Sequence, residues 1–404
     1  MKFRIPTLQT LALTLTLPLF TLALPAQCAA ETMALAWKFH SASPFITSPI
    51  VKGDLVLVGG LDSTFYALDL ATGTLVWKAH TEGEIRSTAM ATESAVCFLS
   101  GDGLVRYLDL HTGKPIWTFP TGGERKHDFA DYYQSSPVQY DSLVYFGSGD
   151  STVYALRILD GFLVWKCHTG DVIHARPAVD SLRLYVGSFD GYFYAFDRLT
   201  GKLIWKFKSV GHDYFPKGEF QGSPTLYRDI LFVGARDYNL YALDREKGYC
   251  HWNKSYPRGW ALPTVVHDTT LYVGTSDDRV QLSLDPATGH EFWRTNLKFN
   301  IFGSIAIVDT IGYVGTLMGK LFGLNIRTGE IVWTFNTDGY VTNHLAYFKP
   351  DDSFRDDIFE KVKSNEAFIE VEYQIGAFYS AAALADNYLV AASADGTVYC
   401  FKRQ

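Results

Sequence analysis

Cysteine is scarce in this sequence, and no two cysteines are neighbours. Five occur in 404 residues: Cys28 near the N-terminus, and Cys97, Cys167, Cys250 and Cys400 scattered through apolar stretches. Proteins stabilised by disulfides usually carry cysteines at paired spacings. A disulfide framework is therefore not expected, and we interpret the last four thiols as small buried hydrophobic groups.

Positive charge is also in short supply. The chain has 36 Lys and Arg against 43 Asp and Glu, a net charge of −7 at pH 7. Loss of residues 1–30, which contain Lys2 and Arg4, would make this balance more negative. Nucleic-acid binding needs a basic surface to neutralise phosphates, so no nucleic-acid partner is expected.

The longest apolar run, residues 8–24, lies at the N-terminus. It follows Lys2 and Arg4 and precedes a cluster of small residues that ends at Ala30. This layout predicts a secretory signal peptide over 1–30 and a periplasmic or secreted protein with no membrane span after cleavage. An uncleaved anchor is the alternative, because the run nearly reaches spanning length, but Pro18 argues against it.

Cys28 raises the question of lipid anchoring. A lipid-attachment site has a small residue directly before the cysteine, but here that residue is Gln27, and Pro25 stands two positions earlier where Leu is usual. Export without a lipid anchor is therefore the favoured prediction.

The sequence is rich in a repeat of about forty residues. The segment 61–80, LDSTFYALDLATGTLVWKAH, has close relatives at 100–119, 188–207 and 276–295. Two turns separate three short apolar segments in each copy, which is typical of an antiparallel meander. In the second turn Asp69 can accept backbone N–H bonds, and Gly73 supplies a positive φ.

Tryptophans and turns each mark eight units. The tryptophans are separated by 40, 40, 48, 40, 47, 41 and 40 residues, at Trp37, Trp77, Trp117, Trp165, Trp205, Trp252, Trp293 and Trp333. Trp37 has no turn before it, and the last turn, at Asp395, has no tryptophan after it. We therefore predict an all-β, eight-bladed β-propeller of four-stranded antiparallel blades, in which the Trp37 strand completes the C-terminal blade.

The motif YALDxxTGxxxW, residues 66–77, resembles the repeat of the PQQ-like (quinoprotein-type) β-propellers. That family includes quinone-dependent alcohol dehydrogenases and the outer-membrane assembly factor BamB. The resemblance covers Trp37 to Phe401, so we expect residues 31–404 to form a single domain. It also implies that the eight repeat tryptophans dock each blade against its neighbour.

Two insertions break the even spacing, at 126–137 before blade 3 and 211–224 before blade 5. Both contain His-Asp-aromatic and end in Gln-x-Ser-Pro, and in a propeller both should lie on the face around the central channel. With equivalent positions of other blades they give the candidate binding residues Arg86, His127, Asp128, Tyr133, Gln134, His174, Arg176, His212, Asp213, Gln221, Trp260 and Tyr379.

The histidines have three interpretations. His127, His174 and His212 can be loop residues with structural hydrogen bonds, or part of a surface that binds a ligand or partner. They can also form a divalent-metal site, because imidazole and carboxylate suit Zn²⁺. No HxH or HExxH spacing in the sequence enforces a metal site.

A longer irregular stretch precedes the last blade, with an acidic insertion at about 345–375. Ser353 is placed to cap a short helix that carries Phe354, Ile358, Phe359 and Val362, and residues 367–375 alternate like a strand. We interpret the insertion as a surface excursion whose apolar side covers the channel mouth or meets a partner.

Two functions remain open. The favoured one is a monomeric, non-catalytic scaffold that binds a protein partner in the cell envelope, as BamB does. The alternative is a dehydrogenase that uses PQQ with Ca²⁺, or another ligand-binding or metal-binding enzyme. The resemblance implies an adjacent Cys-Cys pair and Ca²⁺ ligands for such an enzyme, and neither can be matched here. Because no Asp stands out from the repeat turns as a general base, we expect no cofactor.

Overall fold

The computed structural model describes residues 33–403, and these form one compact unit. The predicted signal peptide and Cys28 lie outside the described residues. None of the helices described between Met33 and Arg403 has the length and apolar character to cross a membrane.

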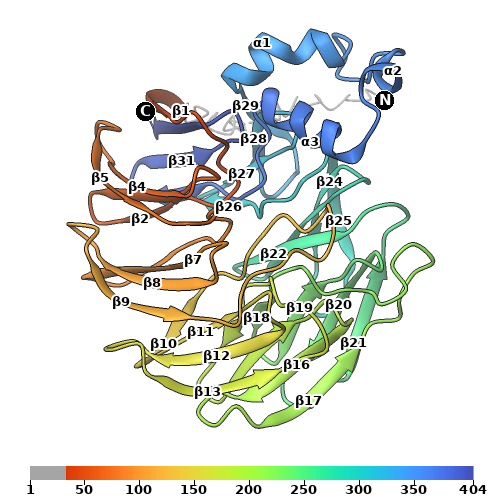
Figure 1. Ribbon diagram of the computed structural model, residues 1–404. Coiled ribbons are helices and arrows are strands. Elements are labelled where there is room, and N and C mark those ends of the chain that lie inside the picture. Colours follow the sequence, from red (N-terminus) through yellow and green to blue (C-terminus); the bar gives the residue numbers. More distant parts are fainter. Residues whose placement is uncertain (1–32, 404) are drawn as a thin grey trace, which may run out of the picture. The chain divides into compact units, whose positions relative to one another are not determined.

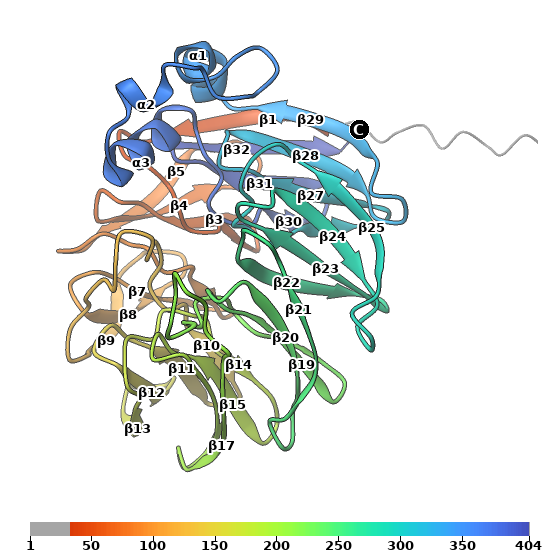
Figure 2. The ribbon, with the colours of Figure 1, turned by 90° about the vertical axis from the view of Figure 1, so that its right-hand side faces the viewer.

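Thirty-two strands form eight four-stranded antiparallel sheets (Figures 1 and 2), which confirms the predicted propeller. Blades 1 to 4 are β2(Ile50–Lys52) β3(Leu55–Gly59) β4(Thr64–Asp69) β5(Leu75–His80), β6(Met90–Ala91) β7(Ala95–Leu99) β8(Leu104–Asp109) β9(Pro115–Pro120), β10(Val138–Tyr140) β11(Leu143–Gly147) β12(Thr152–Arg157) β13(Leu163–His168), and β14(Ala178–Val179) β15(Arg183–Gly187) β16(Tyr192–Asp197) β17(Leu203–Lys208). Blades 5 to 8 are β18(Thr225–Tyr227) β19(Ile230–Gly234) β20(Asn239–Asp244) β21(Cys250–Ser255), β22(Ala261–His267) β23(Thr270–Thr275) β24(Val280–Leu284) β25(Glu291–Asn296), β26(Ala306–Val308) β27(Ile311–Gly315) β28(Lys320–Asn325) β29(Ile331–Asn336), and β30(Ala383–Ala385) β31(Tyr388–Ala392) β32(Thr397–Arg403) β1(Met33–His40).

The ring closes as the repeat order predicts. Strand β1 pairs antiparallel with β32, from Met33 opposite Arg403 to His40 opposite Thr397. It is the outermost strand of blade 8, so the two ends of the described chain share one sheet, as Figure 1 shows where red β1 lies beside blue strands. The innermost strands line the channel, and several neighbours among them contact one another, such as β2 with β30, β26 with β30 and β18 with β22.

The turns have the geometry expected from the repeat. Asp69 Oδ1 accepts the Thr72 N–H at 2.8 Å and the Thr72 hydroxyl at 2.7 Å, and Gly73 has a φ of 72°. Asp62 of the first turn accepts the Thr64 N–H at 3.1 Å. These contacts recur in other blades, so the constant spacing within the repeat reflects local hydrogen bonding.

Each repeat tryptophan from Trp37 to Trp293 reaches into the following blade. The Trp37 indole N–H donates to the Leu70 carbonyl at 2.8 Å, and the Trp77 N–H donates to the Leu110 carbonyl at 2.9 Å. The acceptors for the next five are Ile158, Arg198, Arg245, Pro286 and Ile326. Trp333 packs against Phe401 of blade 8. Blade-to-blade contact therefore combines apolar burial with a directed hydrogen bond.

The insertion before the last blade contains three helices, α1(Asp338–Tyr347), α2(Ile358–Lys361) and α3(Asn365–Gln374). The strand predicted over 367–375 is wrong, because residues 365–374 form α3 and Ile375 is its C-cap. Its N-terminus is capped by Ser364, whose hydroxyl accepts the Ala367 N–H at 3.2 Å. Apolar residues recur on one face at Phe368, Val371 and Ile375, and packing of this face decides for the helix.

The predicted helix around 354–362 is confirmed only for the four residues of α2. Ser353 does not cap it, because its hydroxyl donates to Asp351 at 2.6 Å. The residue before α2 is Asp357, which pairs with Arg355 at 2.9 Å and Lys361 at 3.0 Å. Helix α1, which begins at Asp338, was not predicted, so the helical part of the insertion starts earlier than residue 345.

Candidate functional site

The two inserted segments lie against each other across blades 3, 4 and 5. Gln221 Nε2 donates to the Ala130 carbonyl at 3.1 Å, which joins the second insertion to the first. Lys217 Nζ lies 2.9 Å from Asp171 Oδ2, and His127 Nε2 lies 3.8 Å from Glu219 Oε1. The shared His-Asp-aromatic pattern therefore belongs to segments that fold together on one face of the propeller.

Arg236 lies at the centre of this contact and was missed by sequence reasoning. The side chain is only 1% exposed. Its guanidinium donates to Asp128, and its Nε donates to Gln221 Oε1 at 2.9 Å. It also lies over the rings of Phe189, Phe215 and Trp260, with distances of 4.8, 5.8 and 4.9 Å to their centroids.

A signal for Arg236 is present in the repeat. It occupies the position directly before the turn aspartate of blade 5, here Asp237. The equivalent residues of the other blades carry no charge, and they are Leu61, Gly101, Gly149, Phe189, Ser276, Leu317 and Ala394. A charged side chain at a position that is uncharged in seven blades points to a role specific to this site.

His174 is buried between two carboxylates. Its Nδ1 lies 2.8 Å from both oxygens of Asp131, and its Nε2 lies 3.3 Å from Glu124 Oε2 without hydrogen-bond geometry. Burial would lower the pKa of His174, but Asp131 and Glu124 outweigh it and raise the pKa to about 9. The imidazole is therefore a cation at neutral pH, which stabilises the loop by ion pairing.

His127 and Asp171 continue the charged cluster. His127 Nδ1 lies 3.5 Å from Asp171 Oδ2, and its ring contacts Phe189. Burial opposes ionisation of Asp171, but the Lys217 ammonium, the Val172 N–H and Arg125 lower its pKa to about 2. Asp171 is therefore a carboxylate throughout the physiological range, and its charge is neutralised by Lys217 of the second insertion and by Arg125, directly before the first.

The three candidate metal-binding histidines do not form one site. His127 and His174 both contact Phe189, whereas His212 packs on Tyr214 and Tyr238. Across residues 33–403 no group of three or more His, Cys, Asp or Glu side chains is positioned to hold a metal ion. Asp213, beside His212, is exposed to solvent.

An aromatic plug fills the channel under the helical insertion. We use this name for Tyr132, Phe302 and Tyr379, whose ring centroids lie 5.1 to 6.1 Å apart. They come from the segments before blades 3, 7 and 8, which can meet only across the channel. The Tyr133 hydroxyl adds a 2.6 Å hydrogen bond to the Tyr379 carbonyl.

Helix α3 closes the plug with a buried acid. Glu372 accepts a 2.5 Å hydrogen bond from the Tyr379 hydroxyl. Burial raises the pKa of Glu372 to about 8, although the Tyr379 hydrogen bond acts in the opposite direction. The insertion therefore covers the channel mouth, one of the two roles considered for it from the sequence.

Arg86 and Gln134 hold the segments before blades 2 and 3 together. The Gln134 amide oxygen accepts the Arg86 N–H at 3.0 Å, and the Gln134 N–H donates to the Arg86 carbonyl at 3.2 Å. The Arg86 side chain is paired with Glu84 and donates to the Tyr132 carbonyl at 3.1 Å. Arg86, held by Gln134, therefore fixes the backbone of Tyr132, one of the three plug residues.

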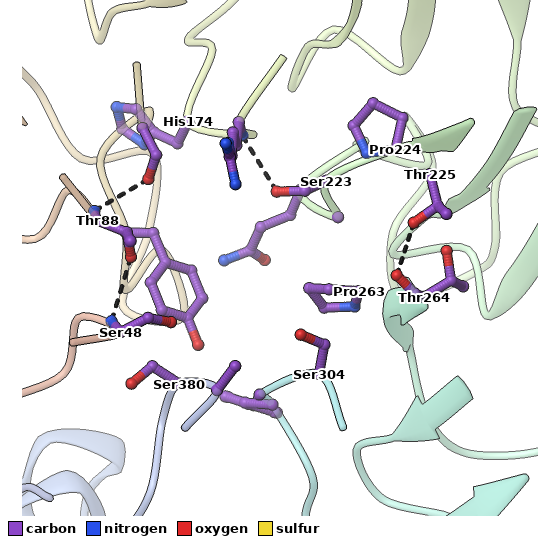
Figure 3. Close-up of a pocket in the computed structure, with 18 of the residues that line it drawn as sticks. Ser48, Thr88, His174, Ser223, Pro224, Thr225, Pro263, Thr264, Ser304 and Ser380 are labelled. Carbon is purple, nitrogen blue, oxygen red and sulfur yellow. Dashed lines mark hydrogen bonds between the residues drawn. The ribbon is translucent and has the colours of Figure 1, made fainter. Parts of the chain in front are cut away.

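A cavity of about 460 Å³ occupies the channel beneath the plug. Residues at the starts of the innermost strands line it, as Figure 3 shows for Ser48, Thr88, Ser223, Ser304 and Ser380. Of the sequence candidates, Arg86, Tyr133, Gln134, His174, Arg176, Gln221 and Tyr379 also line it. Its volume suits a small ligand.

Comparison with known proteins gives the family. A family model described as "Outer membrane protein assembly factor BamB" matches residues 26–198, 149–280 and 252–347. The chain belongs to this family. Among solved structures, BamB from Moraxella catarrhalis is similar with a TM-score of 0.69 and 17% identity, covering 92% of this chain and 100% of that one.

The same fold also carries enzymes. Quinohemoprotein alcohol dehydrogenase from Comamonas testosteroni superposes with a TM-score of 0.69 at 14% identity, over 92% of this chain and 76% of that one. Quinoprotein ethanol dehydrogenase of Pseudomonas putida is 26% identical over 149 residues, which are 33% of this chain and 23% of that protein. A second P. putida enzyme, quinohemoprotein alcohol dehydrogenase ADH IIB, matches over 13% of its length. The chain thus spans only a small part of these curated relatives.

The side chains that line the cavity beneath the plug do not fit PQQ held by Ca²⁺. Ca²⁺ takes oxygen ligands, mainly carboxylates. In the part of the chain that the structure describes, no Asp or Glu lines this cavity, which offers only Gln amides, hydroxyls and backbone oxygens. The four described cysteines are free, with Cys97 and Cys400 buried and the other two partly exposed, so no adjacent pair is available.

Proposed function

We propose that the protein is an exported, non-catalytic propeller scaffold that binds a protein partner of the cell envelope, in the manner of a BamB-type assembly factor. One observation carries the proposal: four charged groups of the loop face are committed to one another in two pairs. Asp128 pairs with Arg236, Asp131 pairs with His174, and the aromatic plug and α3 lie over the channel. A catalytic site needs a reactive group that substrate can reach, and this arrangement leaves the outer loop surface as the interacting part.

Exposed aromatic side chains mark that surface. Phe129, Tyr214 and Phe359 are 53%, 79% and 76% exposed. Each belongs to one of the three insertions, and every insertion connects an outermost strand to the next innermost strand, which places all three on the same face. Exposed aromatic residues supply much of the binding energy at protein interfaces. In this proposal the twelve candidate residues shape the loops beneath these contacts.

The test is site-specific photocrosslinking in the cells that make the protein. A photoreactive residue at Phe129 or Tyr214 is expected to crosslink to a component of outer-membrane protein assembly. The matched control is Phe292 on the outer strand β25, which is 56% exposed but lies outside the insertions. Equal crosslinking from Phe292, or products with no envelope protein, would refute the proposed surface.

Export to the periplasm, with residues 1–30 removed and no lipid on Cys28, is part of the same proposal. It is supported by the sequence pattern of this segment. Mass spectrometry of the protein purified from its own host measures both features. A mass that retains residues 1–30, or that includes acyl chains on Cys28, would contradict this part.

The quinone-dependent dehydrogenase is the second candidate, favoured only by the partial matches to the P. putida enzymes. Purified protein supplied with PQQ, Ca²⁺, an alcohol and an artificial electron acceptor is expected to give no turnover. Activity that disappears when the quinone is omitted would reverse the order of the two candidates.

A further inference from the structure

Arg176 differs from the other cations of the channel because its charge has no partner. The guanidinium lines the 460 Å³ cavity, and among residues 33–403 no hydrogen bond or ion pair to its side chain is found. Arg176 is exposed, so its guanidinium is accessible from the cavity space. An accessible guanidinium without a carboxylate partner is free to pair with an external anion.

The rest of the wall does not supply that anion. The other two cations on it are already neutralised, Arg86 by Glu84 at 2.6 Å and His174 by Asp131 at 2.8 Å. The described wall contains no Asp or Glu, so the cavity holds one uncompensated positive charge.

Three hydroxyl groups on the wall each accept one backbone N–H. The Thr88 hydroxyl oxygen accepts the Ser48 N–H at 3.1 Å, and the Ser136 oxygen accepts the Thr88 N–H at 3.0 Å. In the same way the Ser223 oxygen accepts the Arg176 N–H at 3.2 Å (Figure 3). None of these three hydroxyl groups donates to another group in the described part of the chain, so each O–H is available to donate to a ligand.

Two further hydroxyl groups on the wall are unsatisfied. Thr264 Oγ1 and Ser380 Oγ are buried and have no hydrogen-bond partner in the described part of the chain. Buried polar atoms in folded proteins nearly always have a partner, so such exceptions mark places where a ligand or solvent completes the structure. They come from blades 6 and 8, while Arg176 comes from blade 4, so unmatched polar groups surround the cavity.

We infer that this cavity is a binding site for a small oxyanion, a carboxylate or phosphate group that pairs with Arg176 and accepts hydrogen bonds from the hydroxyl ring. A guanidinium matches the two oxygens of either group bidentately. The site is separate from the exposed loop aromatics of the proposed function and does not depend on them.

The experiment measures binding of inorganic phosphate and of succinate to the full chain by calorimetry and by thermal shift, with NaCl at equal ionic strength as the salt control. At least one anion is expected to raise the melting temperature beyond the NaCl control. Arg176→Gln is expected to weaken its binding at least about tenfold, because a charge-assisted pair is lost. Binding of phosphate but not succinate would indicate a phosphate ligand, and the reverse result would indicate a carboxylate ligand.

The matched control is Arg327→Gln, which removes an exposed arginine at a blade turn outside the cavity and should leave binding unchanged. A second cavity variant, Ser223→Ala, keeps the charge and should weaken binding less. The inference is overturned if neither anion binds in the millimolar range, or if Arg176→Gln binds as tightly as the parent. Arg176→Gln with the photoreactive residue at Phe129 should crosslink as the parent does, which would show that the partner-binding surface does not depend on the anion site.

Discussion

The indole ring of Trp77 lies directly against the backbone of Gly113 in the next blade. A Cβ on Gly113 would approach the Trp77 ring to 2.5 Å, and the indole N–H donates to Leu110 three residues earlier. The same contact recurs for seven pairs, Trp37–Gly73, Trp77–Gly113, Trp117–Gly161, Trp165–Gly201, Trp205–Gly248, Trp252–Gly289 and Trp293–Gly329. The glycine of the TG turn is therefore required for its positive φ and for the space that the previous blade's tryptophan occupies.

Gly113→Ala tests this double requirement. Gly53→Ala is the matched control, because Gly53 has a similar φ of 55° but no atom within 4 Å of the place where an alanine methyl group would lie. The control should lose about 1–2 kcal/mol of unfolding free energy from the left-handed backbone alone. Gly113→Ala should lose roughly a further 1–3 kcal/mol from overpacking against Trp77. Urea unfolding measures both values, and equal losses would show that the tryptophan contact is not restrictive.

Removal of β1 tests ring closure. Deletion of residues 33–40 takes away the partner of β32 and the Trp37 contact with blade 1. The melting temperature is expected to fall sharply, because an open ring exposes the edge of blade 8. Lys38→Ala is the control, since it leaves the strand intact and removes an exposed ion pair with Asp338 and a cation–π contact with Tyr399 at 5.6 Å, whose contributions are small. A deletion variant that melts like Lys38→Ala would contradict closure through β1.

The fold was predictable from the sequence because the repeat is defined by contacts between residues close together in the chain. The turn aspartates bind N–H groups two or three residues away, and tryptophans at near-constant spacing count the blades. Closure of the ring by β1 was also predictable, because the first tryptophan has no turn before it and the last turn has no tryptophan after it. In contrast, the sequence of α3 fits both a strand and a helix. Residues 369–375 alternate apolar and polar as in a strand, while Phe368, Val371 and Ile375 share one face of a helix. Packing of that face against the residues in the channel selects the helix.

The contact between the two insertions was predictable, but the partners of their side chains were not. Extra residues at equivalent crossovers of a propeller lie on one face, and Gln221 of the second insertion does bond to Ala130 of the first. The partners of the candidate residues come from other blades at sequence separations that no local pattern contains. Arg236 meets Asp128 from 108 residues away, and His174 meets Asp131 from 43 residues away. Glu372 was hidden for a further reason, because a strand would have placed it with exposed Glu370.

Replacement of His174 should destabilise the loop face. His174→Ala leaves Asp131 and Glu124 buried without their cation, and loss of one partner of a buried pair typically costs about 3–5 kcal/mol. His212→Ala is the control, because His212 is partly exposed and makes ring contacts with only Tyr214 and Tyr238, so its loss should be much smaller. Chemical unfolding at pH 7 measures the difference.

The pH dependence of the parent gives a second readout for His174. Its folded pKa of about 9 lies above the usual 6.5, so the stabilisation is complete below pH 6.5 and is lost as the pH rises through 9. The stability difference between the parent and His174→Ala should therefore shrink over this range. A difference that stays constant from pH 6 to pH 9 would show that His174 is not held as a buried cation.

Glu372 should make the protein more stable in acid than at neutral pH. Its folded pKa is about 8, above the usual 4.5, so the folded state keeps a proton that the unfolded state releases. Its contribution to stability therefore falls as the pH rises from about 4.5 to 8 and is constant above that.

The variant Glu372→Gln tests this assignment. It keeps the shape and an acceptor for the Tyr379 hydroxyl without the charge, so at pH 8 the variant should be more stable than the parent by a few kcal/mol. Glu370→Gln, on the exposed side of α3, should change little. Unfolding free energies of the three proteins between pH 5 and pH 9 decide the matter, and a parallel pH profile for Glu372→Gln and the parent would mean that Glu372 is ionised beneath the helix.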